Sequence, residues 1–134
     1  MSNTTRYGII GAGMMAQEHI QNIYLLDDAA VTAVCDPVRS SLTWAESTMR
    51  SIDGANADAV QYFTDHRDML AKADLAAIII ASPNFTHIDI LRDTMQTDLA
   101  HSVEKPLCTT MEDAPAIAER VKSVDPVSWV GVDC

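Results

Sequence analysis

Short apolar runs of β type alternate along the chain with stretches in which apolar residues recur at helical spacing. The run from Leu75 to Ala81 is continuously apolar, which is typical of a central parallel strand buried on both faces. The pattern predicts strands at Tyr7–Ile10, Val31–Cys35, Gln61–Phe63, Leu75–Ala81, Leu99–Val103 and Val127–Val132. Strands that alternate with helices indicate βαβ units, so we expect an α/β fold with a mainly parallel sheet.

The helices expected between these strands carry recognisable start signals. Ser40 or Ser41 is a candidate cap, and Asp65–Asp68 and Thr110–Asp113 each resemble a capping box. Helices are predicted at Met14–Leu26, from Ser40 or Ser41 to Met49, from Asp65 to Lys72, at Thr86–Met95 and from Thr110 to Val124. Together these elements predict a single domain over residues 1–134.

The composition is that of an acidic globular protein. Hydrophobic residues make up 48% and charged residues 21% of the chain, a folded rather than a disordered profile. With a net charge of −10 and only three lysines, the chain lacks the basic surface that nucleic-acid phosphates require. The longest apolar run is too short to cross a bilayer, and the N-terminus is too polar for a secretory signal. We therefore expect a cytoplasmic protein that binds neither nucleic acid nor membrane.

The cysteines and histidines lack the spacing of metal or redox sites. The three cysteines form no CxxC pair, and the four histidines stand far apart with no acidic cluster between them. Reduced, mostly buried thiols and the absence of a metal site are the expectation.

A glycine-rich turn joins the first predicted strand to the first helix. Residues 11–16 read GAGMMA and fit the pattern GxGxxA. Gly11 would permit the tight turn, Gly13 would let the backbone approach a pyrophosphate, and Ala16 would allow close helix–strand packing. A purely structural turn is the alternative. The position between strand and helix favours dinucleotide binding and a Rossmann-type, doubly wound sheet of six strands.

Asp36 closes the second predicted strand, roughly 20 residues after the glycines, where a carboxylate can accept hydrogen bonds from both adenosine ribose hydroxyls. A 2′-phosphate would meet this carboxylate as a like charge, so NAD is favoured over NADP. Arg39 lies near enough in sequence to complicate that preference. An Asp-Pro turn is the alternative interpretation, and both can hold for one residue.

Four segments in this order resemble the glucose–fructose oxidoreductase / inositol dehydrogenase / MocA-like family. They are GIIGAGMMAQEHI, CDP, IASPNFTH and VEKPLCTTMEDA, within a match that runs from Arg6 to about Val132. The most specific element is Glu104-Lys105-Pro106 after the fifth predicted strand. The resemblance implies an NAD(P)-dependent oxidoreductase that acts by hydride transfer on sugars, inositols or related polyols.

The resemblance also implies a role for each matching position. The pyrophosphate and the adenosine ribose would be held at the ends of the first two strands by Gly11, Gly13, the amides of Met14 and Met15, and Asp36. The rest of the cofactor would be lined by Ser82, Pro83, Asn84, His87 and Glu104, with Glu104 at the nicotinamide-side ribose. Lys105, which also borders the cofactor, would be the catalytic residue that polarises a substrate oxygen or assists the proton relay.

Some of these residues have simpler alternatives. Asn84 could make an Asx-type turn, and His87 could cap its helix or pack against it. Lys105 outside the motif would be a solvated surface cation.

Members of the family typically continue past the sixth strand into a substrate domain. Residues 131–134 stand where that domain would begin, so we expect a chain without it that is catalytically incomplete. Two alternatives stay open: a half-enzyme completed by a separate substrate-domain chain, and a non-catalytic, dinucleotide-binding regulatory module. An apolar surface near Trp129 is expected to favour self-association.

Overall fold

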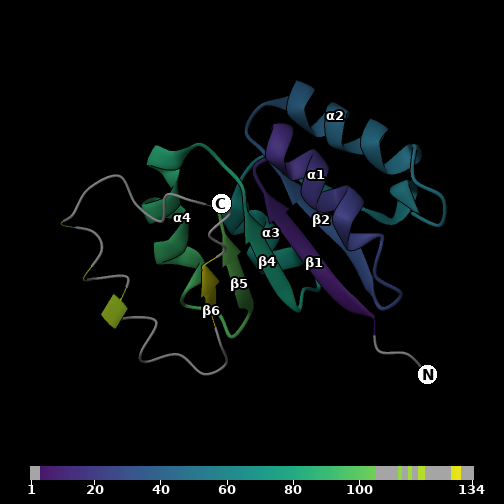
Figure 1. Cartoon of the computed structure of the whole chain (residues 1–134). Coiled ribbons are helices and arrows are strands. Elements are labelled where there is room, and N and C mark those ends of the chain that lie inside the picture. Colours follow the sequence, from purple (N-terminus) through teal and green to yellow (C-terminus); the bar gives the residue numbers. More distant parts are fainter. Residues whose placement is uncertain (1–3, 105–111, 113–114, 116–117, 120–127, 131–134) are drawn as a thin grey trace.

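A parallel sheet forms the centre of the molecule (Figure 1). The structure is a computed structural model and describes residues 4–104, 112, 115, 118–119 and 128–130. The strands are β1 (Thr5–Ile10), β2 (Ala29–Cys35), β3 (Gln61–Phe63), β4 (Ala77–Ile80), β5 (Ala100–Val103) and β6 (Ser128–Val130). They lie in the order β3-β2-β1-β4-β5-β6, and each neighbouring pair is parallel. The predicted α/β class and parallel sheet are confirmed.

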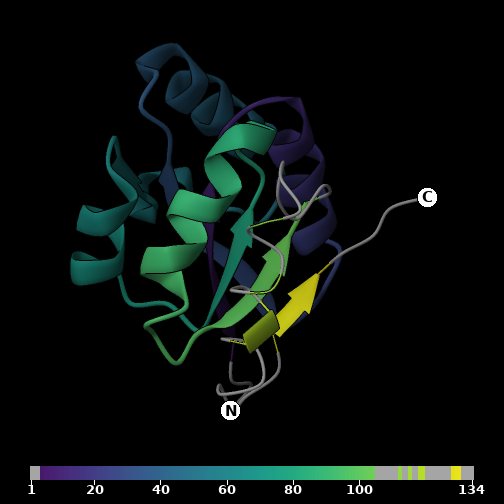
Figure 2. The same cartoon turned by 90° about the vertical axis from the view of Figure 1, so that its left-hand side faces the viewer.

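Helices cover both faces of this sheet (Figures 1 and 2). They are α1 (Met14–Ile23), α2 (Arg39–Arg50), α3 (His66–Lys72) and α4 (His87–Thr94), with short 3₁₀ turns η1 (Ala57–Ala59) and η2 (Asn84–Thr86). The apolar sides of α1 and α2 pack on one face in a core that contains Ile20 and Leu42. On the other face, α3 and α4 contribute Met69 and Leu91 to a second core. No helix among the described residues is long and apolar enough to cross a membrane.

The central strand is shorter than the apolar run that predicts it. All four residues of β4 are buried, as expected for a strand covered on both faces. Beyond its ends, Ala76 N–H donates to the Arg6 carbonyl at 2.8 Å and Ala81 N–H to the Ile10 carbonyl at 2.8 Å. The run therefore follows β1 from Ala76 to Ala81, although only its middle is regular strand.

The prediction that α1 extends to Leu26 is wrong. The helix ends at Ile23, and Leu25 is 80% exposed despite its apolar side chain. The chain must turn here to bring β2 alongside β1, and the Asp28 carbonyl accepts a hydrogen bond from Thr5 N–H at 2.7 Å. The geometry of this return, rather than helix propensity, fixes the end of α1.

The expected caps are only partly correct. Neither Ser40 nor Ser41 caps α2, because the helix begins at Arg39 with Val38 as its N-cap residue. Asp65 does cap α3, since its carboxylate accepts a hydrogen bond from Arg67 N–H at 2.9 Å. The helix predicted from Thr110 to Val124 lies outside the described residues except for positions 112, 115 and 118–119.

Candidate functional site

A cleft of about 820 Å³ opens at the carboxyl ends of the strands. Residues at or just beyond four strand ends line it, namely Ile10, Cys35, Thr64 and Ala81. The chain passes from β1 to β2 on one side and from β4 to β5 on the other, so β1 and β4 flank the point where the strand order reverses. In open α/β sheets, ligands bind at such a switch point.

Gly11 is required by the packing of the glycine-rich turn against the end of β4. Its φ of +97° lies in the left-handed region, and a Cβ there would stand 2.4 Å from the Ser82 backbone nitrogen. The Gly11 N–H also donates to the Cys35 carbonyl at 2.7 Å, which continues the contact with β2. The tight-turn role predicted for Gly11 therefore has a direct steric cause.

Gly13 differs from Gly11, because it faces open space. It has an ordinary φ of −82°, and a Cβ built there meets nothing within 4 Å. Gly13 also lines the cleft together with Met14 and Met15, whose amides begin α1 and lack partners within the helix. The bare backbone at Gly13 leaves room for a group such as a phosphate to approach these amides.

Asp36 connects the glycine-rich turn to the end of β2. One carboxylate oxygen, Oδ2, accepts a hydrogen bond from Ala12 N–H at 2.8 Å, and Oδ1 accepts one from Val38 N–H at 2.8 Å. The residue is only 9% exposed, yet it lines the cleft. Because each carboxylate oxygen has further lone pairs, Asp36 can fix the two loops and still accept hydrogen bonds from a ligand.

The loop after β4 forms the opposite wall. Ser82 and Pro83 line the cleft, whereas Asn84 begins η2 and is not a lining residue. His87 is fully buried, and its Nε2 lies 2.8 Å from the Ser82 carbonyl, to which it donates. His87 does not line the cleft either, so the geometry favours the packing interpretation, in which the ring supports the loop from inside.

Glu104 lies at the end of β5 and pairs with a residue that the sequence analysis does not single out. Its backbone N–H donates to the Ile80 carbonyl at 2.9 Å, and its carboxylate contacts His19 Nε2 from α1. Both side chains are largely buried, with 16% and 23% exposed. This contact links α1 to the end of β5. Lys105, the predicted catalytic residue, lies outside the described residues.

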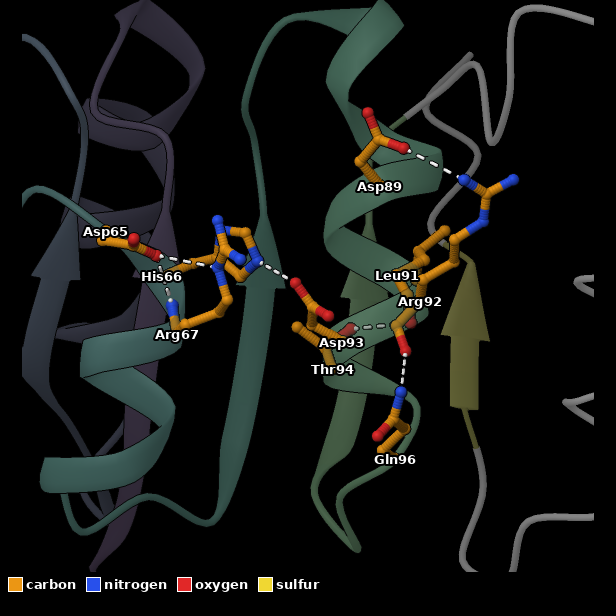
Figure 3. A network of polar contacts seen from close by, with 9 residues as sticks. All are labelled: Asp65, His66, Arg67, Asp89, Leu91, Arg92, Asp93, Thr94 and Gln96. Atoms are coloured by element: carbon orange, nitrogen blue, oxygen red, sulfur yellow. Dashed lines mark hydrogen bonds and ion pairs between the residues drawn. The ribbon is translucent and has the colours of Figure 1, made fainter.

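A further wall of the cleft is built from the start of α3, where Asp65, His66 and Arg67 follow β3. Figure 3 shows His66 reaching across to α4, where its Nε2 lies 2.7 Å from Asp93 Oδ2. The Arg67 amide lowers the pKa of the Asp65 carboxyl from its usual value. These contacts join α3 to α4 beside the cleft.

Cys35 lies at the base of the cleft and remains a thiol. Burial, together with nearby Asp36, raises its pKa to about 12. The neutral, buried thiol agrees with the expectation of a reduced cysteine without nucleophilic character. Among the described residues, no group of three His, Cys, Asp or Glu is placed to hold a metal ion.

Sequence reasoning missed His19, His66 and Gln17. His19 and His66 meet partners 85 and 27 positions away, so no local spacing marks them. Gln17 gives a clearer signal, because it interrupts the apolar face that Ala16, Ile20 and Ile23 form on α1. A polar residue on an inward helix face normally has a buried hydrogen-bonding partner.

The strand order, the glycine-rich turn at the switch point and the acid at the end of β2 define a Rossmann-type nucleotide-binding domain. Residues 5–132 match the oxidoreductase family with an NAD-binding Rossmann fold, known as Gfo/Idh/MocA. The chain belongs to this family, which confirms the resemblance predicted from the sequence motifs.

Two bacterial proteins are among the relatives that match this chain. Inositol 2-dehydrogenase from Pseudarthrobacter chlorophenolicus is 36% identical over 120 residues, which cover 89% of this chain and 33% of that protein. The rhizopine catabolism protein MocA from Rhizobium meliloti is 30% identical over 87% of this chain and 35% of its own length. The chain therefore spans about a third of the length of the relatives it matches.

Solved structures share the same fold. The myo-inositol dehydrogenase from Lactobacillus casei, in complex with NAD(H) and myo-inositol, superposes with a TM-score of 0.81 at 27% identity over 96% of this chain and 36% of its own. The WlbA dehydrogenase from Bordetella pertussis, in complex with NADH and UDP-GlcNAcA, has a TM-score of 0.83 at 23% identity over 98% of this chain and 36% of its own. At that identity the likeness to WlbA concerns the fold alone.

Proposed function

We propose that the cleft binds NAD, and that the chain is the cofactor domain of an oxidoreductase that acts on inositols, sugars or related polyols by hydride transfer. The observation that carries this proposal is the open backbone at Gly13 beside an Asp36 carboxylate bonded to the same turn. Support for the substrate class comes from a relative named inositol 2-dehydrogenase and from the solved myo-inositol complex. Bound NAD would supply the carbon centre that accepts or returns the hydride.

Each part of the cofactor has residues suited to it. The pyrophosphate would lie over Gly11 and Gly13, held by the amides of Met14 and Met15 at the positive end of α1. Apolar side chains with large exposed fractions, Met14 at 71% and Phe85 at 72%, would border the rings of the cofactor. They offer apolar surface that a bound ligand would cover.

The nicotinamide half would extend over Ser82 and Pro83 toward Glu104. The contact with His19 of α1 holds the Glu104 carboxylate in place at the end of β5. Lys105 follows directly in the chain, and we assign it the catalytic role of polarising the substrate oxygen or exchanging its proton. For Asn84 and His87 we propose indirect roles, in which they shape the loop that borders the cofactor. Completion by a separate substrate-domain chain, and self-association through apolar surface, remain predictions.

NAD is proposed over NADP because of charge. A 2′-phosphate on the adenosine ribose would lie against the Asp36 carboxylate, which is 9% exposed and so poorly screened by water. Arg39, which could offset this repulsion, is exposed and does not line the cleft. Arg67 does line the cleft, and its guanidinium pairs with Asp65 at 3.4 Å. The solved myo-inositol dehydrogenase complex contains NAD(H), which supports the same choice.

Asp36→Asn tests this assignment. Asparagine keeps the shape and one oxygen acceptor and removes the negative charge, but its NH2 group faces the N–H of either Ala12 or Val38. The readout is therefore the ratio of the NADH and NADPH affinities and not either affinity alone. We expect the unmutated chain to bind NADH at least about tenfold more tightly than NADPH, a difference of about 1.4 kcal/mol. In Asp36→Asn, and further in Asp36→Ala, that ratio should shrink. Fluorescence titration with both cofactors measures it, and equal affinities in the unmutated chain would exclude the ribose role of Asp36.

A further inference from the structure

A buried glutamine lies directly beneath the glycine-rich turn. Gln17, on the inward face of α1, is 7% exposed. Its Nε2 group donates one hydrogen bond to the Ala12 carbonyl at 2.9 Å and another to the Gly13 carbonyl at 3.1 Å. Both hydrogens of the side-chain amide are thus used on the two consecutive peptides that begin the proposed phosphate site.

A threonine from the next helix bonds the oxygen of this amide. Thr48 of α2 is 8% exposed, and its hydroxyl donates to Gln17 Oε1 at 2.7 Å. The Trp44 carbonyl, at 3.1 Å, competes for the same single hydroxyl hydrogen over a longer distance. If the Gln17 amide were reversed, its oxygen would face two carbonyl oxygens, acceptor against acceptor. The two carbonyls therefore fix the orientation of the amide, and the Thr48 hydroxyl satisfies and holds the buried oxygen that this orientation leaves.

These two bonds, together with the backbone bond that the Gly13 carbonyl accepts from Gln17 N–H at 3.3 Å, fix where the neighbouring amides point. In a trans peptide the C=O and the following N–H point in opposite directions. Because the Ala12 carbonyl points at Gln17, the Gly13 N–H points away from it, and the Gly13 carbonyl fixes the Met14 N–H in the same way. On the other side of the turn, the Ala12 N–H is held by Asp36. The turn is thus anchored from α1 and from β2.

We propose that Gln17, held by Thr48, is a positioning residue that aims the Gly13 and Met14 amides at the cofactor pyrophosphate. This inference rests on the proposed function, since it assumes that the cleft binds a dinucleotide. The contact between α1 and α2 would then contribute to cofactor affinity. Preorganised donors bind a phosphate more tightly because they need not be ordered when the ligand arrives.

A matched pair of substitutions at position 48 tests the proposal. Thr48→Val keeps the side-chain shape without the hydroxyl, and Thr48→Ser keeps the hydroxyl. NADH, ADP and adenosine are titrated against each variant and against Gln17→Leu. We expect Thr48→Val and Gln17→Leu to weaken NADH and ADP by about tenfold, the equivalent of one good hydrogen bond. Adenosine, which lacks phosphate, should be nearly unaffected, and Thr48→Ser should bind all three like the unmutated chain.

Two results would overturn the inference. Equal losses for adenosine and NADH would show that Gln17 only supports the fold, and unchanged NADH binding in Thr48→Val would show that the Thr48 hydroxyl does not help to hold the Gln17 side chain in place. Backbone order parameters of Gly13 and Met14 in the ligand-free chain distinguish a failure of the positioning role from a failure of the proposed function. They should fall in Gln17→Leu even if no nucleotide binds, and unchanged values would contradict the positioning role.

Discussion

Substitution of Gly13 separates cofactor binding from folding, because the backbone at this position faces open space. A Cβ at Gly13 has nothing within 4 Å, and the φ of −82° suits any residue. Gly13→Val should therefore cost at most about 1 kcal/mol of stability, mainly through the weaker N-cap preference of valine. The added methyl groups would fill the space through which a phosphate reaches the Met14 and Met15 amides. We expect NADH affinity to fall at least about 100-fold, which corresponds to about 2.7 kcal/mol.

The assay is NADH titration by fluorescence, paired with thermal unfolding of the same samples. Gly11→Ala provides the contrast, since its Cβ would stand 2.4 Å from the Ser82 backbone and its φ is +97°. That variant should lose several kcal/mol of stability, about 2–4 kcal/mol from strain and overpacking, before binding is considered. If Gly13→Val folds and binds NADH like the unmutated chain, the glycine-rich turn is only a turn and the cofactor assignment loses its main support.

His101 and Lys105 provide two further tests. Burial lowers the pKa of His101 from its usual 6.5, and its Nε2 has no hydrogen-bond partner among the described residues. As the pH falls through 6.5, His101 is therefore protonated in the unfolded chain before it is protonated in the folded chain. The free energy of unfolding then decreases until the pH reaches the folded-state pKa of His101. The Tm of the unmutated chain should drop between about pH 7.5 and about pH 5.5, and the Tm of His101→Leu should drop less. Equal drops in the two proteins would exclude His101 as the cause. Hydride transfer needs the substrate held against the nicotinamide, and the chain spans about a third of the length of the relatives it matches. With NAD and a panel of inositols, sugars and polyols, we therefore expect no steady NADH production above a Lys105→Met control. Steady turnover from a pure preparation would contradict this.

The sequence pattern predicts the sheet well because its strands are bounded by strong local signals. The run ending at Ala81 and the glycine-rich turn after Ile10 mark the two strands at the switch point, and both are found there. The end of α1 is not predictable in the same way. Leu25 and Leu26 extend the apolar pattern, yet they are exposed because the chain must return to start β2.

The site is predicted at the level of positions but not of contacts. Asp36 stands at the cleft as expected, but local sequence does not reveal that its carboxylate already binds the amides of Ala12 and Val38. The motif leaves open whether His87 borders the cofactor or packs against its helix, and in the fold the residue is fully buried. The His19–Glu104 contact joins residues 85 positions apart, so it depends on the tertiary arrangement that brings α1 to the end of β5.

The measurement that tests the central claim most directly is a calorimetric titration of the unmutated chain with NADH. We expect saturable binding at one site per chain. The Gly13→Val variant should lose this binding while it unfolds at nearly the same temperature as the unmutated chain. The absence of saturable binding to a folded chain would contradict the central claim, as would undiminished binding after the Gly13 substitution.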